Sequence, residues 1–176
     1  MEKRLFVAVD LPEAIKEEIT KISAQLPKDG VLLVSKENLH ITLKFIGEVE
    51  IKKVEEIKSK LRSIKMKNFE CKLKGVGVFP NENYIRVVWI GIESETLLQL
   101  AKKVESTLID IGKKEDREFS PHLTIARVSK KIDLQNFLWK NREREFGGFT
   151  VAEFALFEST LTPNGPIYKK IETYEL

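Results

Sequence analysis

The chain has few of the features that mark secreted or membrane proteins. Cys71 is its one cysteine, so no internal disulfide can form, and the composition favours a reducing cytoplasm. No apolar run approaches the roughly 18–20 residues that a membrane span needs, so we expect no membrane segment. The 30 basic and 27 acidic residues nearly cancel. This balance excludes a strongly polycationic nucleic-acid binder, although a local basic patch remains compatible with it.

The remaining composition is that of a folded globular protein. Hydrophobic residues make up 42% of the 176 residues and charged residues 32%, which argues against disorder. Neither a linker nor a low-complexity segment interrupts the chain. We therefore expect a single bilobal domain over residues 1–176, acting as a monomer.

Histidine is scarce, yet both histidines occur in the same setting. His40 and His122 are each followed two residues later by a threonine, Thr42 and Thr124, inside an apolar run. Side chains two residues apart share one face of a strand, so each imidazole and hydroxyl should point the same way. The opposite, buried face is then expected to carry Ile41, Leu43, Phe45, Leu123 and Ile125.

Apolar periodicity predicts alternating strands and helices. Strands are expected over residues 4–9, 31–34, 39–46, 69–78, 84–92, 119–128, 149–158 and 168–176. Helices are expected over the apolar faces at residues 15–26, 54–64, 95–111 and 134–138. Asp10 with Glu13 has capping-box spacing, Gly47 should end the strand before it, and Gly112 is a candidate C-cap.

The two histidines are 82 residues apart, close to half the chain, which suggests an internal duplication. We predict an α+β fold of two pseudo-symmetric lobes. Each lobe would consist of mostly antiparallel sheet with helices on the outer face, and a central cleft between the lobes would hold the site.

Paired His-x-Thr faces suit acid–base chemistry at phosphorus. Histidine titrates near pH 6.5, so one ring can accept a proton while the other donates one. Threonine hydroxyls can hydrogen-bond an oxyanion between the rings. Three other interpretations fit less well: a zinc site with distant carboxylates lacks spaced ligands, a serine or cysteine triad leaves one histidine idle, and a purely structural role does not explain two matched copies.

The sequence also resembles a known family, the RNA 2′,3′-cyclic phosphodiesterases, historically called 2′-5′ RNA ligases, of the two-histidine phosphoesterase superfamily. The resemblance spans the whole chain and is carried by the segments 5–12, 38–47 and 120–127, by Glu158-Ser159, and by Gly165-Pro166-x-Tyr168.

The resemblance implies that RNA with 2′,3′-cyclic phosphate ends, such as tRNA halves, is the substrate and that neither a metal nor another cofactor takes part. By position, His40 would be the general acid on the ribose O3′ and His122 the base that activates water. Thr42, Thr124 and Arg127 would bind the phosphate. Alternative functions are 2′-5′ RNA ligation, hydrolysis of a small cyclic nucleotide, and binding of RNA ends without turnover.

Three further expectations concern side-chain direction. In a regular pleat Arg127 would lie on the face opposite His122, so a bulge would have to redirect it toward the phosphate. Lys44 would lie on the His40 face as a solvated lysine. Aromatic side chains that could stack on a base are Phe79, Tyr84, Trp89 and Phe119, although the core is their more ordinary location.

Overall fold

The computed structural model describes all 176 residues and contains two antiparallel sheets with four α-helices. The strands are β1 Glu2–Asp10, β2 Val31–Leu33, β3 His40–Glu50, β4 Phe69–Asn81, β5 Tyr84–Glu93, β6 His122–Val128, β7 Glu145–Val151, β8 Glu153–Thr162 and β9 Gly165–Glu175. The helices are α1 Glu13–Ser23, α2 Val54–Arg62, α3 Glu95–Thr107 and α4 Gln135–Asn141. The predicted α+β class is confirmed. No helix combines the length and apolarity that a membrane crossing requires.

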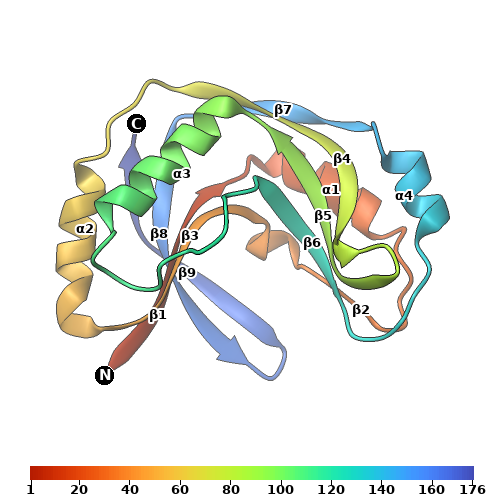
Figure 1. The fold of residues 1–176 in the computed structure, drawn as a ribbon, viewed down its shortest axis with the longest axis horizontal. Helices are drawn as coiled ribbons and strands as arrows, with labels where there is room; N and C mark the ends of the chain where they lie inside the picture. The colour runs from red at the N-terminus through yellow and green to blue at the C-terminus, as the bar shows by residue number, and fades with distance from the viewer.

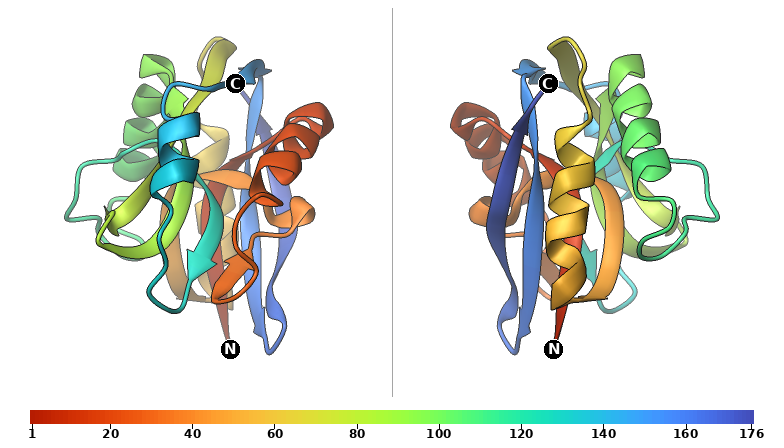
Figure 2. Two further views of the ribbon diagram at one scale, coloured as in Figure 1. Left: turned by 90° about the vertical axis from the view of Figure 1, so that its right-hand side faces the viewer. Right: turned by 90° about the vertical axis from the view of Figure 1, so that its left-hand side faces the viewer.

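Each motif histidine begins a strand in a different sheet. Sheet A has the strand order β3-β1-β8-β9, and sheet B the order β2-β6-β5-β4-β7. Strands β3 and β6, which begin at His40 and His122, contact each other where the two sheets meet (Figure 1). The long β8–β9 hairpin projects from the body on the side of the N-terminus (Figures 1 and 2).

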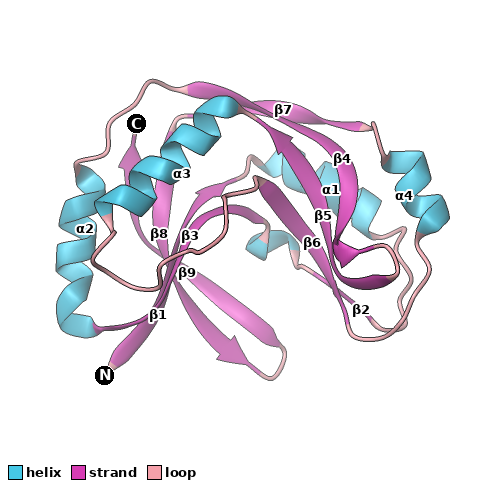
Figure 3. Cartoon of the chain, in the orientation of Figure 1, coloured by secondary structure: helices cyan, strands magenta, loops and turns pink.

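The helices connect the two lobes. Helix α1 follows β1 of sheet A but packs against β6 and β7 of sheet B, and α3 follows β5 of sheet B but packs against β3 of sheet A. Helices α2 and α4 cover opposite ends of the molecule (Figure 3). The lobes are therefore not two successive halves of the chain, because each sheet is covered by a helix that follows a strand of the other.

One large core of 42 buried residues includes side chains from both sheets and all four helices. In β1 the residues Leu5, Val7 and Val9 point into this core. Phe6 and Ala8 alternate with them and form a small separate cluster with Ala155 and Phe157 on the other face of sheet A. The face of sheet A that carries this small cluster is thus free to line a cleft.

The strand predicted over residues 149–158 is wrong as a single element. Residues up to Val151 belong to β7, which pairs with β4 in sheet B, while Glu153 starts β8, which pairs with β1 in sheet A. The chain changes sheets at Ala152. No glycine or proline lies between residues 149 and 158 to mark a break, so the sequence pattern alone could not separate the two strands.

Two predicted glycine roles also differ. Gly47 does not end its strand: it has φ +88° and lies within β3, which continues to Glu50. Gly112 does not cap α3, which ends at Thr107. A Cβ at Gly112 would collide with the carbonyl of Ile46, so this glycine lets the loop after α3 pack directly on β3.

The predicted capping box at α1 is wrong as well. Pro12 occupies the N-cap position and no side chain caps the helix. The Asp10 carboxylate instead accepts the N–H of Leu11 at 2.8 Å and pairs with Lys16 at 2.9 Å. Because Asp10 is the last residue of β1, it joins the strand end to the helix.

Candidate active site

The five site residues predicted from the sequence, His40, Thr42, His122, Thr124 and Arg127, all line one cleft. Its volume is about 560 Å³. The first two come from β3 of sheet A and the other three from β6 of sheet B. Its remaining walls come from β1, β2 and its following loop, and the β8–β9 hairpin. The structure thus brings together residues that are distant in sequence.

Both imidazoles are held in the same tautomer by the backbone. The Nδ1 of His40 lies 2.6 Å from the Asn38 carbonyl, and the Nδ1 of His122 lies 2.8 Å from the Ser120 carbonyl. A carbonyl only accepts hydrogen bonds, so each Nδ1 must carry a proton. The neutral rings therefore leave Nε2 as the atom that can take up a proton.

Aromatic side chains surround His40. Its ring centroid is 4.9 Å from that of Phe6 and 5.2 Å from that of Tyr168, which stands edge-on to it. Burial lowers the pKa of His40 from its ordinary value of 6.5, and the hydrogen bond to Asn38 only partly opposes this. The neutral Nε2 then accepts the hydroxyl of Thr42 at 2.9 Å.

His122 has a more open environment. Phe79 packs edge-on against its ring at 5.2 Å, and no side chain bonds its Nε2. The strand begins at His122 rather than at residue 119 as predicted. The two histidines are thus alike in tautomer but differ in solvation.

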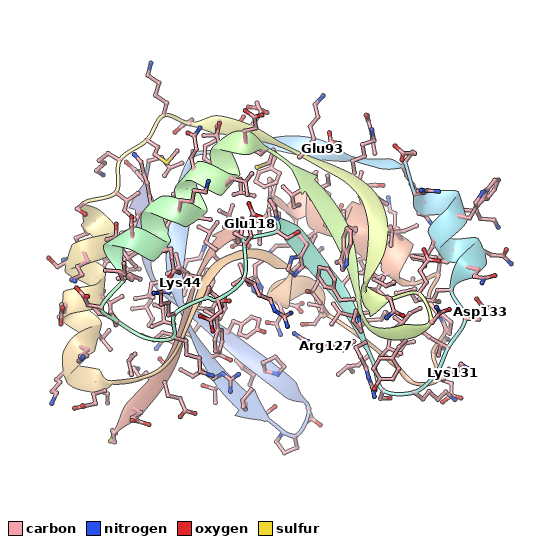
Figure 4. All side chains as sticks on the ribbon, viewed as in Figure 1. Lys44, Glu93, Glu118, Arg127, Lys131 and Asp133 are labelled. Atoms are coloured by element: carbon pink, nitrogen blue, oxygen red, sulfur yellow. The ribbon has the colours of Figure 1, made fainter.

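A β-bulge occurs at the same position after each histidine. The pairing of β3 with β1 skips Leu43, and the pairing of β6 with β5 skips Ile125. Each is the third residue after its histidine, and the extra residue reverses the alternation that follows. As a result Phe45 and Arg127, both five residues after a histidine, line the cleft. Figure 4 shows Arg127 between β6 and the β8–β9 hairpin.

The bulges explain why Arg127 lines the cleft and correct two other expectations. Phe45 does not lie on the buried face with Ile41, because the bulge at Leu43 turns it to the cleft. Lys44 is not solvated on the His40 face: it is 2% exposed and lies on the opposite side of β3. There its ammonium binds Glu105 of α3 at 2.6 Å. Figure 4 labels Lys44 near the C-terminal end of that helix.

The charged side chains that line the cleft carry only positive charge. No aspartate or glutamate is among its lining residues, whereas two arginines, Arg4 and Arg127, are. Neither guanidinium has a carboxylate within 4 Å. An anion in this cleft would meet unpaired positive charge with no competing carboxylate.

Two residues that were not predicted from the sequence as site residues, Arg4 and Phe6, line the cleft from β1. Their two-residue spacing could have indicated a shared face, but only the pairing of β1 with β3 brings that face next to His40. None of the four proposed stacking residues, Phe79, Tyr84, Trp89 and Phe119, lines the cleft. Phe79 and Trp89 instead pack together at 5.3 Å behind His122.

The fold offers few side chains that could together bind a metal ion. No three histidine, cysteine, aspartate or glutamate side chains gather anywhere in the fold into a group that could hold a metal ion. Cys71 is buried and unpaired within β4, away from the cleft.

Comparison with known proteins agrees with this geometry. A family model described as LigT-like phosphoesterase matches residues 9–89 and again residues 90–168. The RNA 2′,3′-cyclic phosphodiesterase of Methanocaldococcus jannaschii is 45% identical over 97% of this chain and 99% of its own. The protein of the same name from Archaeoglobus fulgidus is 41% identical over 98% of this chain and 99% of its own.

Solved structures share the fold along the whole chain. A crystal structure of Escherichia coli LigT complexed with 3′-AMP has a TM-score of 0.86 at 28% identity, covering 100% of this chain and 99% of that one. The crystal structure of TT0787 of Thermus thermophilus has a TM-score of 0.84 at 30% identity, covering 98% and 97%.

Proposed function

Because this chain belongs to the LigT-like phosphoesterase family, we propose that it hydrolyses RNA 2′,3′-cyclic phosphate ends to 2′-phosphates. In this proposal His40 and His122 act as an acid–base pair without a metal. Relatives that align over nearly their full length carry the name RNA 2′,3′-cyclic phosphodiesterase, which supports this substrate class.

The main support for the proposal is that the two histidines are held in the same tautomer. Each ring has its Nδ1 tied to a backbone carbonyl two residues earlier, so each keeps Nε2 for proton transfer. Both rings line one cleft that has no carboxylate. One ring can therefore act on the incoming water and the other on the leaving oxygen.

His40 and His122 are sufficient for the proton transfers that this hydrolysis requires. The oxygen of a water molecule bonds to phosphorus as His122 takes a proton from that water. The bond between phosphorus and O3′ breaks, and His40 gives its proton to O3′. The products are a 2′-phosphate and a free 3′-hydroxyl, and a proton passed from His122 to His40 through solvent restores the starting state.

The burial of His40 affects when it can act as the acid. Burial lowers its pKa, so the ring is mostly neutral in the free protein at pH 7. A bound cyclic phosphate is an anion and favours the charged imidazolium beside it. Substrate binding would thus favour protonation of His40, which then has the proton that it donates.

The other cleft residues would stabilise the charge that develops on phosphorus. The hydroxyls of Thr42 and Thr124 can donate to its non-bridging oxygens, as donors of an oxyanion hole do. The guanidinium of Arg127 can bind the same oxygens through two parallel hydrogen bonds. These roles fit the location of all three side chains in the cleft.

We also propose a domain organisation, an oligomeric state and a cellular compartment for this protein. We assign the whole chain to one bilobal domain that acts as a monomer in the cytoplasm, where its single cysteine suits the reducing conditions. RNA fragments that end in a cyclic phosphate, such as tRNA halves, would be its substrates.

The test is incubation of the protein with a 2′,3′-cyclic-phosphate oligonucleotide in excess EDTA, with the phosphate position of the product identified by ³¹P NMR. We expect a 2′-phosphate at an undiminished rate. A 3′-phosphate product would contradict the assignment of the leaving oxygen. A rate that falls with EDTA and recovers with zinc or manganese would contradict the metal-independent mechanism.

A further inference from the structure

The second arginine of the cleft, Arg4, has no role in the reaction described above. It lies on β1, two residues before Phe6, and its guanidinium carbon is 5.0 Å from the ring centroid of Phe45. Glu48 is its direct cross-strand neighbour, yet the two side chains form no ion pair. The charge of Arg4 is thus held over an aromatic face in the cleft rather than neutralised.

Arg4 is displaced along β1 from the position that faces the motif threonine Thr42. Arg127 is three residues after Thr124, and Phe45 occupies the matching position three residues after Thr42. Arg4 packs on that ring. Along β1 it is four residues from Ala8, the cross-strand partner of Thr42, or about 13 Å at 3.3 Å per residue.

Both arginines nevertheless act on the same part of the cleft. Burial raises the pKa of the Tyr168 hydroxyl, and the charges of Arg127 and Arg4 both oppose that rise. Tyr168 belongs to the projecting β8–β9 hairpin, which forms one wall of the cleft. The cleft therefore holds two unpaired cations, Arg127 on β6 and Arg4 near the N-terminal end of β1.

We propose that Arg4 binds the phosphodiester on the 5′ side of the terminal nucleotide, so that the cleft recognises an oligonucleotide end rather than a mononucleoside cyclic phosphate. The inference rests on the proposed function. A reactive cyclic phosphate carries one negative charge, which Arg127 can bind. A second unpaired guanidinium, on a different strand of the same cleft, fits a second phosphate of the same RNA strand.

The test compares two substrates that differ by that phosphodiester. One is adenosine 2′,3′-cyclic phosphate, and the other is the dinucleotide ApA ending in a 2′,3′-cyclic phosphate. Wild type, Arg4→Ala, Arg4→Lys and Arg86→Ala are assayed for kcat and KM. Arg86 is the matched control, because its guanidinium also lies over an aromatic ring, that of Tyr84 at 4.4 Å, but outside the cleft.

We expect the Arg4→Ala loss in kcat/KM to be about tenfold to a hundredfold larger for the dinucleotide than for the mononucleoside, mainly through KM, as for one charged hydrogen-bonded contact. Arg4→Lys should recover part of the difference. Arg86→Ala should leave the ratio between the two substrates unchanged.

A substrate whose internucleotide linkage is uncharged provides a second test. When the dinucleotide linkage is a methylphosphonate, wild type should bind it about as weakly as Arg4→Ala binds the normal dinucleotide. Arg4→Ala should show little further loss with this substrate, because the contact is already missing.

The outcomes separate this inference from the proposed function. If wild type opens neither substrate, the proposed function is wrong. If wild type opens both and Arg4→Ala weakens both equally, the function stands and the second phosphate site is overturned. A methylphosphonate linkage that wild type accepts as readily as the charged linkage overturns it too.

Discussion

The buried ammonium of Lys44 joins the first motif strand to helix α3 through Glu105, at 2.6 Å. The same ammonium donates to the carbonyl of Lys113 at 2.9 Å, and the N–H of Lys113 donates to the Ile46 carbonyl at 3.0 Å. The loop that leads to His122 is thereby attached to the strand that carries His40. The side chain of Lys44 is 1% exposed and that of Glu105 is 34% exposed, so the two partners differ in solvation.

This difference predicts an asymmetric effect of removing either partner. Glu105→Ala leaves a buried charge with only a carbonyl acceptor, and should reduce the free energy of unfolding by about 3 kcal/mol. Lys44→Met leaves a carboxylate that water can reach, so its cost should be smaller. Urea denaturation of both variants and of the double variant measures this. Equal costs for the two single variants would contradict the asymmetry.

Removal of either histidine should abolish most turnover. His40→Ala and His122→Ala should each lower kcat by about 10²–10⁴, the usual contribution of general acid–base catalysis. The double variant should lose much less than the product of the two, because the residues act as a unit. Circular dichroism and binding of a 2′-phosphate oligonucleotide serve as controls for folding. If the loss of kcat in the double variant equals the product of the two single losses, the histidines act independently.

The lowered pKa of His40 should be visible directly. In the free protein its ring should titrate below pH 6.5, because burial penalises the charged form, and addition of a 2′-phosphate product should move the midpoint upward. With only two histidines in the chain, NMR of the ring protons in wild type and His122→Ala assigns both signals. A midpoint at or above 6.5 in the free protein would contradict this prediction.

The same shift has a consequence for stability. Because the folded pKa of His40 lies below the unfolded one, its contribution to stability is present above about pH 6.5 and is lost as the pH falls through the folded value. We expect His40→Gln to flatten the unfolding free energy between that folded pKa and pH 6.5. Denaturant titrations of both proteins over this pH range test the sign.

Substitutions of the two motif threonines can distinguish a hydrogen-bonding role from a packing role. Thr→Val keeps the shape and removes only the hydroxyl, so Thr42→Val and Thr124→Val should be as damaging as the alanine variants, by about 10²–10³ in kcat for an oxyanion donor. Steady-state kinetics on a cyclic-phosphate oligonucleotide measures this. Were the valine variants nearly as active as wild type, packing would explain the threonines.

Arg127 should contribute mainly to binding. Arg127→Ala should raise KM more than it lowers kcat, and Arg127→Lys should keep part of the effect, because a lysine supplies the charge without the paired donors. Arg86→Ala, which removes an arginine outside the cleft, is the control. Unchanged kinetics in Arg127→Ala would show that its location in the cleft has no bearing on the phosphate.

Much of this protein could be predicted from its sequence because local pattern determines local structure. Apolar periodicity located all four helices, and the i, i+2 rule put His40 with Thr42 and His122 with Thr124. The repeated motif was enough to suggest that two strands share one site. These inferences need only the geometry of a single strand or helix.

The tertiary structure decided what depends on pairing between strands. The bulges at Leu43 and Ile125 reverse the alternation, which brings Phe45 and Arg127 into the cleft and buries Lys44. A bulge is defined by the partner strand, and no single-strand pattern contains that partner. For the same reason Arg4 could not be assigned to the site from the sequence: only the pairing of β1 with β3 brings it over Phe45.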